Sequence, residues 1–284
     1  MDELRDKPLM ARPIGMPPPM AAVMAYAPIP PPVPTYPEVP MPRKGAAVDL
    51  AVMVLLLAAV QFGLGASGLG RLLIDRWKML GIFSVNVIFG AASLLSVYVV
   101  LTLRRQPAAM IGLNRVSGLR VLVATVIAVP AAFAAGAMAN LAYVAATGFD
   151  VERFMNERTG FLAAVPDIPV GFAVLFAVFV GFHEEITFRG FFLSRLRALC
   201  GSTPAAIILT SLVFGSLHAY QGWSGVFQTA AVALVLAIVA ACSRTLWPTI
   251  LAHACFDTIG LVLAPLAVRM MKDLQVVPVI AGWW

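Results

Sequence analysis

The run AAVDLAVMVLLLAAVQFGLGA, residues 46–66, decides the class of fold, because Asp49 is its one charged residue. About 20 consecutive apolar residues suffice for an α-helix to cross the hydrocarbon of a bilayer. The whole chain agrees with this segment: 61% of its 284 residues are hydrophobic and 12% are charged, and the mean hydropathy is +0.90. A soluble domain is nearer half apolar and a quarter charged. We therefore expect an integral membrane protein, with Asp49 at the membrane interface.

Further apolar runs follow the first and leave no room for a soluble domain. They predict an all-α, polytopic integral membrane protein of about seven transmembrane helices. Paired tryptophans at the C-terminal end suit a membrane interface. The predicted spans are 46–66, 80–103, 119–146, 168–199, 204–220, 225–242 and 246–268.

The first 45 residues differ from the rest, because thirteen of the 21 prolines lie there. That density excludes a helix and predicts a disordered or polyproline-II tail. We interpret the tail, residues 1–45, as a spacer before a transmembrane domain at 46–284; a ligand for a proline-binding partner is the alternative. Removing residues 1–42 is then expected to leave turnover of a short peptide nearly unchanged.

Lys and Arg residues between the spans set the predicted orientation, because they are enriched in cytoplasmic loops. Most lie in alternate loops, which predicts a cytoplasmic N-terminus, and we place the chain in the plasma (inner) membrane. Loop 67–81, with three basic residues, does not fit. The net charge of +6 comes from loops rather than from a basic face, so we expect no nucleic-acid partner. The cytoplasmic set is Arg43, Lys44, Arg104, Arg105, Arg115, Arg120, Arg195, Arg197 and Arg244.

Ionisable groups are unusually dense in the run GFHEEITFRGFF, residues 181–192. Intramembrane ionisable side chains are costly and by default indicate a functional site. The alternative is a buried charge network that only ties helices together. Those inside or at the edge of spans are His183, Glu184, Glu185, Arg189, His218, His253 and Asp257.

Helix geometry separates the two glutamates of this run. Glu185 and Arg189 are four residues apart on one face, with the acid before the base, which is the favourable order for an ion pair. Glu184 points about 100° away and has no cation partner on its own helix. A desolvated carboxylate of that kind suits a general base.

Two predicted hairpins bring the remaining groups to similar depths. The fourth and fifth spans turn at CGSTP, residues 200–204, so Glu184 and His218 both lie roughly 25 Å from the turn. The sixth and seventh turn at SRTLWP, residues 243–248, which puts His253 and Asp257 roughly 12–18 Å from that turn. One cluster can therefore collect side chains from three helices.

Three short motifs in this order resemble a known family. EEITFR, residues 184–189, fits Glu-Glu-x-x-x-Arg; FGSLH, residues 214–218, fits Phe-x-x-x-His; and HACFD, residues 253–257, fits His-x-x-x-Asn/Asp. On consecutive spans they resemble the CAAX protease and bacteriocin-processing family of intramembrane proteases, which includes the Ras-converting prenyl endopeptidases. The resemblance covers about residues 168–268.

The resemblance implies an all-helical fold with an active-site cavity inside the bilayer and a peptide or membrane-protein substrate. The family more often has Asn where Asp257 stands. We favour a neutral, hydrogen-bond-donating Asp257; an ionised Asp257 that holds His253 charged, or a metal ligand, is the alternative. By the resemblance, Glu184 with His218 would activate the attacking water, His253 with Asp257 would stabilise the oxyanion, and Glu185 with Arg189 would support the site.

A metal is left open by the sequence. Glu184, His218 and His253 would supply the two-His, one-Glu set of many catalytic zinc sites, and a metal-free glutamate mechanism is equally open. The zincin pattern H-E-x-x-H fails, because Thr187 replaces the second His, and His183 is interpreted as structural. The three cysteines fit neither a disulfide framework nor a zinc spacing.

Two other classes of function remain as alternatives. A membrane immunity or binding factor could use the same scaffold without catalysis. A proton-coupled transporter also buries carboxylates and histidines. Such transporters are typically built from internal repeats, which this sequence lacks.

Overall fold

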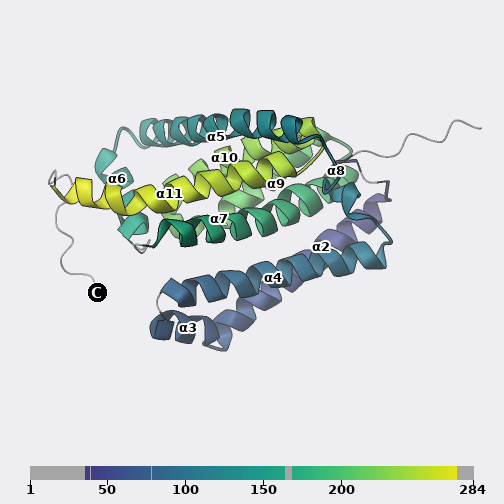
Figure 1. Cartoon of the computed structure of the whole chain (residues 1–284), viewed down its shortest axis with the longest axis horizontal. Helices are drawn as coiled ribbons and strands as arrows, with labels where there is room; N and C mark the ends of the chain where they lie inside the picture. Colours follow the sequence, from purple (N-terminus) through teal and green to yellow (C-terminus); the bar gives the residue numbers. More distant parts are fainter. Residues whose placement is uncertain (1–35, 39, 78, 164–167, 274–284) are drawn as a thin grey trace, which may run out of the picture. The chain divides into compact units, whose positions relative to one another are not determined.

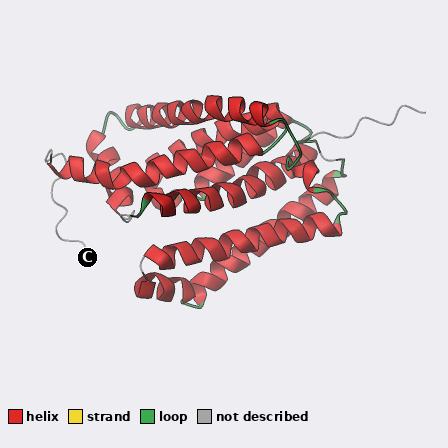
Figure 2. Ribbon diagram, viewed as in Figure 1, coloured by secondary structure: helices red, strands yellow, loops and turns green. Residues whose placement is uncertain are grey.

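The computed structural model describes residues 36–38, 40–77, 79–163 and 168–273, and within these ranges every regular element is a helix (Figure 2). The predicted all-α class is confirmed. The α-helices are α2 (Arg43–Ala66), α3 (Leu69–Trp77), α4 (Met79–Leu103), α5 (Gly118–Ala146), α6 (Val151–Ala163), α7 (Val170–Glu184), α8 (Leu193–Cys200), α9 (Thr203–Ser216), α10 (Gly222–Ser243) and α11 (Trp247–Asp273). They are joined by two 3-10 helices, η1 (Ala108–Ile111) and η3 (Ala219–Gln221), and by one π-helix, η2 (Glu185–Phe192).

Among the described residues, five helical segments are long and apolar enough to cross a membrane, which supports an integral membrane protein. The fifth and seventh predicted spans correspond to shorter apolar helices, Thr203–Ser216 and Trp247–Leu263, so the count of seven stays a prediction. The five long segments are Arg43–Ala66, Leu80–Leu103, Gly118–Ala146, Val170–Cys200 and Ala219–Ser243.

Both predicted hairpin turns are present. Gly201 ends α8 in the left-handed region, with φ of 72°, where glycine has no side chain to clash. Ser202 then caps α9, because its hydroxyl accepts a hydrogen bond from the Ala205 amide at 3.4 Å. Arg244, also left-handed with φ of 57°, ends α10 before α11 begins at Trp247.

The helices that carry the three motifs pack against one another directly. α11 contacts α7 and α5, and α10 contacts α5 and α9. Figure 1 shows α5, α11 and α7 side by side. The helix made by α7, η2 and α8 is therefore bordered by α11 along its first part and by α9 along its last part.

Asp49 lies near the start of α2 and is buried against other helices, so its predicted place at the membrane interface stays a prediction. Its side chain is 3% exposed, and its Oδ1 lies 2.6 Å from Nη2 of Arg104 in α4. Its Oδ2 lies 3.6 Å from Nε of the fully buried Arg195 in α8. A carboxylate removed from water needs such cationic partners, and here they join α2 to both α4 and α8.

The end of the proline-rich segment contacts the helical domain. Tyr36 is 2% exposed and belongs to a core cluster that also contains Ile111, Phe191 and Leu246. Residues 1–35 and 39 lie outside the described residues, so the predicted domain boundary at residue 45 stays a prediction.

Candidate active site

The double-glutamate motif lies where the helix widens. Residues 185–192 form a π-helix, η2, between two α-helical stretches, and all eight residues are buried. Wide turns of this kind are rare and occur frequently at functional sites. The Thr187 hydroxyl donates to the carbonyl oxygen of His183 at 2.7 Å, a local bond that competes with regular helix geometry. The wide turn was not predicted, because the apolar run that contains it is typical of one continuous helix.

The predicted Glu185–Arg189 ion pair is present and is buried away from the protein surface. Nη1 of Arg189 lies 2.8 Å from Oε1 of Glu185, and the two side chains are 1% and 0% exposed. Oε2 of Glu185 has no hydrogen-bond partner among the described residues. A pair this deeply buried is strongly coupled, because removing one member would leave the other charge without compensation.

His253 is the centre of the cluster. Its Nδ1 lies 2.8 Å from Oε1 of Glu185, and its Nε2 faces Oε2 of Glu184 at 3.6 Å and Oδ2 of Asp257 at 3.4 Å. Carboxylate oxygens are acceptors, so this surrounding favours an imidazole that carries a proton on both nitrogens. Two adjacent glutamates of one helix and a carboxyl group of another therefore share one histidine.

A close helix crossing explains how His253 reaches both glutamates. A Cβ placed on Gly181 would lie 3.2 Å from the Ala254 nitrogen and 3.2 Å from the Ile250 oxygen. No side chain separates the two backbones at this point, so α7 and α11 approach closely. Glu184 is three residues from the crossing on α7, and His253 is beside it on α11.

Phe214 links the cationic part of the site to the second histidine. The guanidinium carbon of Arg189 lies 4.2 Å from the centre of the Phe214 ring, a distance typical of a cation–π contact. The His218 ring lies 4.7 Å from the same ring. The predicted packing of Phe214 on His218 is confirmed. Its contact with Arg189 was not predicted, because it joins residues on different helices.

The hydrogen bond of His218 fixes which nitrogen is available for chemistry. Its Nδ1 lies 2.8 Å from the carbonyl oxygen of Phe214. A carbonyl only accepts, so Nδ1 carries the proton and the neutral ring presents Nε2 as an acceptor. His218 is half-buried, and Glu184 is 19% exposed in its side chain, so both are more accessible than the Glu185–Arg189 pair.

The structure brings five of the six predicted site residues into direct contact. Within the described ranges no hydrogen bond or ion pair joins His218 to Glu184, so their predicted meeting stays a prediction. His183 lies apart on the face toward Gly90 of α4, and its buried Nε2 has no partner among the described side chains. The five in contact are Glu184, Glu185, Arg189, His253 and Asp257.

Among the residues that the structure describes, no group of three His, Cys, Asp or Glu side chains is arranged to hold a metal ion. Glu184, His218 and His253, the set that a metal would use if present, therefore stay a prediction. In this geometry His253 is bound to Glu185 through Nδ1, and its Nε2 faces Glu184 and Asp257.

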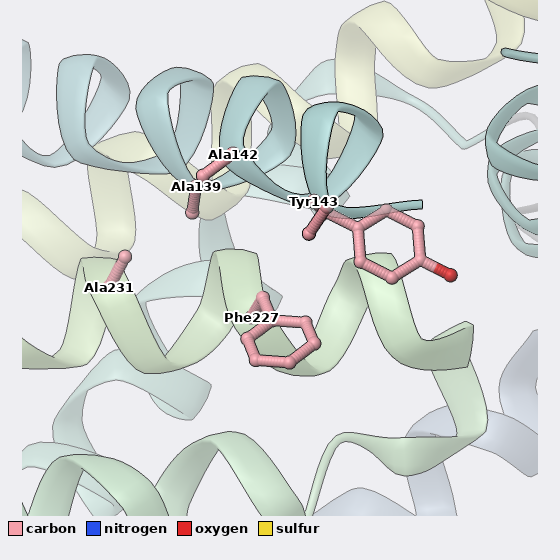
Figure 3. Close-up of a pocket in the computed structure, with 6 residues that line it drawn as sticks. Ala139, Ala142, Tyr143, Phe227 and Ala231 are labelled. Atoms are coloured by element: carbon pink, nitrogen blue, oxygen red, sulfur yellow. The ribbon is translucent and has the colours of Figure 1, made fainter. Parts of the chain in front are cut away.

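A cavity of about 380 Å³ opens elsewhere, between α5 and α10. Figure 3 shows the aromatic rings of Tyr143 and Phe227 and the small side chains around it. None of the six predicted site residues lines it, so the predicted intramembrane active-site cavity stays a prediction. Its lining is Ala139, Ala142, Tyr143, Ala146, Phe227 and Ala231.

Comparison with known protein families agrees with the motifs. Residues 166–259 match the family described as type II CAAX prenyl endopeptidase Rce1-like. The matched segment contains all six predicted site residues. No curated protein and no solved structure matches the chain.

Proposed function

We propose that this chain, whose segment 166–259 matches the type II CAAX prenyl endopeptidase Rce1-like family, is an intramembrane endopeptidase that hydrolyses a peptide bond. The observation that carries the proposal is the convergence on His253 of Glu184, Glu185 and Asp257, from two helices, within the matched segment. An ion-pair network that only fastened helices together would not need a second, partly accessible glutamate beside the buried Glu185–Arg189 pair.

In the proposed reaction, Glu184 and His218 together activate a water molecule. The Glu184 carboxylate takes a proton from the water while Nε2 of His218 accepts a hydrogen bond from it. The hydroxide oxygen then bonds to the carbonyl carbon of the substrate. Amide hydrolysis needs this base and also a proton for the departing amine, which the protonated Glu184 can return when the C–N bond breaks.

The developing oxyanion would be held by His253 and Asp257. A histidine with protons on both nitrogens donates one to Glu185 and has the other available for the oxyanion. Glu185 and Arg189 hold the ring in orientation and never contact the substrate in this scheme. Preorganised donors of this kind act strongly in a dry site, since no solvent has to reorganise.

The proposal also includes the number of spans and the orientation of the chain in the membrane. Seven spans, with α9 as the fifth and the apolar part of α11, Trp247–Leu263, as the seventh, would place the N-terminus in the cytoplasm and the chain in the plasma membrane. Water would reach the site through a cavity inside the bilayer. The substrate is a peptide or a segment of a membrane protein; the proline-rich tail could recruit a partner.

Cleavage by the purified full-length protein tests the proposal. The probes are three peptides: one ending in a prenylated Cys-a-a-X sequence, the same peptide without the prenyl group, and a bacteriocin-type leader peptide. Glu184→Gln and His218→Ala should each lower kcat about 100- to 10,000-fold, the usual contribution of general acid–base catalysis. The control is Glu152→Gln, an exposed glutamate of α6.

Equal cleavage by either site variant and the wild type would refute the assignment. Each peptide is also tested with a chelator. Loss of activity that zinc restores would add a metal held by Glu184, His218 and His253, and would show that the site rearranges from the geometry described above.

A further inference from the structure

Tyr36 has an unexpected position for a residue of a proline-rich segment. Its hydroxyl donates a hydrogen bond to the backbone carbonyl oxygen of Arg189, in the middle of the π-helix, and its side chain is 2% exposed. Burial, together with the charge of Glu185, raises the pKa of Tyr36 well above its ordinary value, so the hydroxyl remains a donor. Tyr36 thus reaches the backbone of the same residue whose side chain pairs with Glu185.

The same aromatic ring borders the loop that fixes the start of α11. Gly112, with φ of 87°, lies against it: a Cβ there would be 3.3 Å from Cδ1 of Tyr36 and 3.0 Å from Cγ of Leu246. The Gly112 carbonyl accepts hydrogen bonds from the Leu246 amide at 2.9 Å and from the Thr245 hydroxyl at 3.2 Å. Tyr36 therefore touches both the π-helix and the support of the helix that carries His253.

We propose that Tyr36 is a positioning residue, whose hydroxyl holds the Arg189 carbonyl and thereby keeps the wide turn in which Arg189 meets both Glu185 and the Phe214 ring. The catalytic part of this inference rests on the proposed endopeptidase function. In a regular α-helix each carbonyl bonds to the amide four residues on, whereas in a π-turn that bond moves to the fifth. A hydroxyl donor at the Arg189 carbonyl competes with the regular bond and so stabilises the wide form.

The side-chain contacts of Arg189 show why the turn matters. The guanidinium meets Glu185 at 2.8 Å and the Phe214 ring at 4.2 Å. Glu185 and Arg189 can face each other in a regular α-helix too, but a return to that spacing would turn Arg189 relative to the Phe214 ring on α9. Glu185, which binds Nδ1 of His253, would then lose the fixed position of its cation partner. The hydroxyl of Tyr36 acts on the reaction only through this series of contacts.

The variant Tyr36→Phe in the full-length protein tests the inference, because it removes the hydroxyl and keeps the ring. Tyr98→Phe in α4, where the side chain is 66% exposed, is the matched control. The first measurement is backbone amide exchange of peptides covering 185–200, and the second is kcat and KM on a cleaved peptide. We expect faster exchange over 185–200 and kcat lower by about 2- to 10-fold, the scale of one hydrogen bond, with KM nearly unchanged.

Three results would overturn the inference: exchange over 185–200 that equals the wild type, faster exchange confined to residues 36–45, or faster exchange over 185–200 with an unchanged kcat. If the wild type cleaves none of the peptides, the proposed function fails, and exchange over 185–200 alone still decides whether Tyr36 holds the π-helix. The two failures are therefore distinguishable.

Discussion

The charges around His253 balance only if one of its carboxyl neighbours carries a proton. Glu185 is paired with Arg189, and a doubly protonated His253 balances an ionised Glu184. The proposed base, Glu184, must be ionised to take a proton from water, so we propose that Asp257 is the neutral member of the cluster. Asp257 would then donate a hydrogen bond, as the Asn more usual in the family would.

Substitution of Asp257 separates a neutral donor from a charged one. Asp257→Asn keeps a donor, so it should retain most of the activity and extend it to higher pH, where an acid would lose its proton. Asp257→Ala should lose roughly ten- to a thousandfold in kcat, the scale of one oxyanion donor. The measurement is a pH–rate profile of both variants; an Asn variant as inactive as the Ala variant at every pH would disprove the neutral donor.

At the scale of single elements, α6 is fastened to the start of α10 through Glu157. Oε2 of Glu157 accepts a hydrogen bond from the Ser224 amide at 2.9 Å, and Oε1 accepts from the Tyr143 hydroxyl at 2.8 Å. The first amides of a helix lack partners inside the helix and carry partial positive charge, so an anion stabilises them. Burial acts to raise the pKa of Glu157, but these hydrogen bonds outweigh it and lower the pKa.

This lowered pKa predicts a pH-dependent stability. The contribution of the Glu157 charge is complete above the unfolded-state pKa of about 4.3 and is lost as the pH falls through the lower folded-state value. At neutral pH, Glu157→Gln should lower the free energy of unfolding by about 0.3–1 kcal/mol, and the difference from the wild type should vanish in acid. Thermal unfolding in detergent at both pH values measures it.

Glu152→Gln, an exposed change in the same helix, is the control for non-specific charge effects. A difference between the wild type and Glu157→Gln that stays the same in acid as at neutral pH would contradict the capping role.

Local sequence signals predicted the elements and their turns better than the contacts between them. The hairpin turn at Gly201 and Ser202 followed from residue types that favour a left-handed end and a helix cap. The Glu185–Arg189 pair followed from spacing on one helix. The wide turn of η2 did not, because its hydroxyl donor, Tyr36, comes from 153 residues away in the chain.

At the scale of the whole molecule, two contacts that were not predicted both involve distant segments. Asp49 pairs with Arg195 of α8, and Tyr36, in a segment expected to be a spacer, is buried against η2. Periodicity and composition indicate which face of a segment is buried and whether the segment suits a membrane. They do not indicate which distant residue a single side chain contacts. For the same reason the fold class could be predicted, but not the Phe214–Arg189 contact.

The burial of Tyr36 revises the expectation for the tail. Deleting residues 2–35 keeps Tyr36 and should leave kcat within about twofold of the full-length value, whereas deleting residues 2–42 should lower it by at least the 2- to 10-fold expected for the lost hydrogen bond. Turnover of a short peptide by the two truncated proteins measures this. Equal activity of both would return the tail to the role of a spacer, and an equal loss in both would assign the effect to the first 35 residues.

The contact at Gly181 determines how steady the catalytic geometry is over time. Side chains change rotamer within picoseconds to nanoseconds where they are free to move, while shifts of whole helices take microseconds or longer. At Gly181 the main chains of α7 and α11 approach each other closely. A Cβ placed on Gly181 would lie 3.2 Å from the Ala254 nitrogen and 3.2 Å from the Ile250 oxygen. The distance between the backbone positions of Glu184 and His253 therefore depends mainly on two stiff helices and little on changes of side-chain rotamer. In the proposed reaction, successive water molecules would then meet nearly the same arrangement of acceptor and donor, and the protein would not have to reassemble it for each turnover.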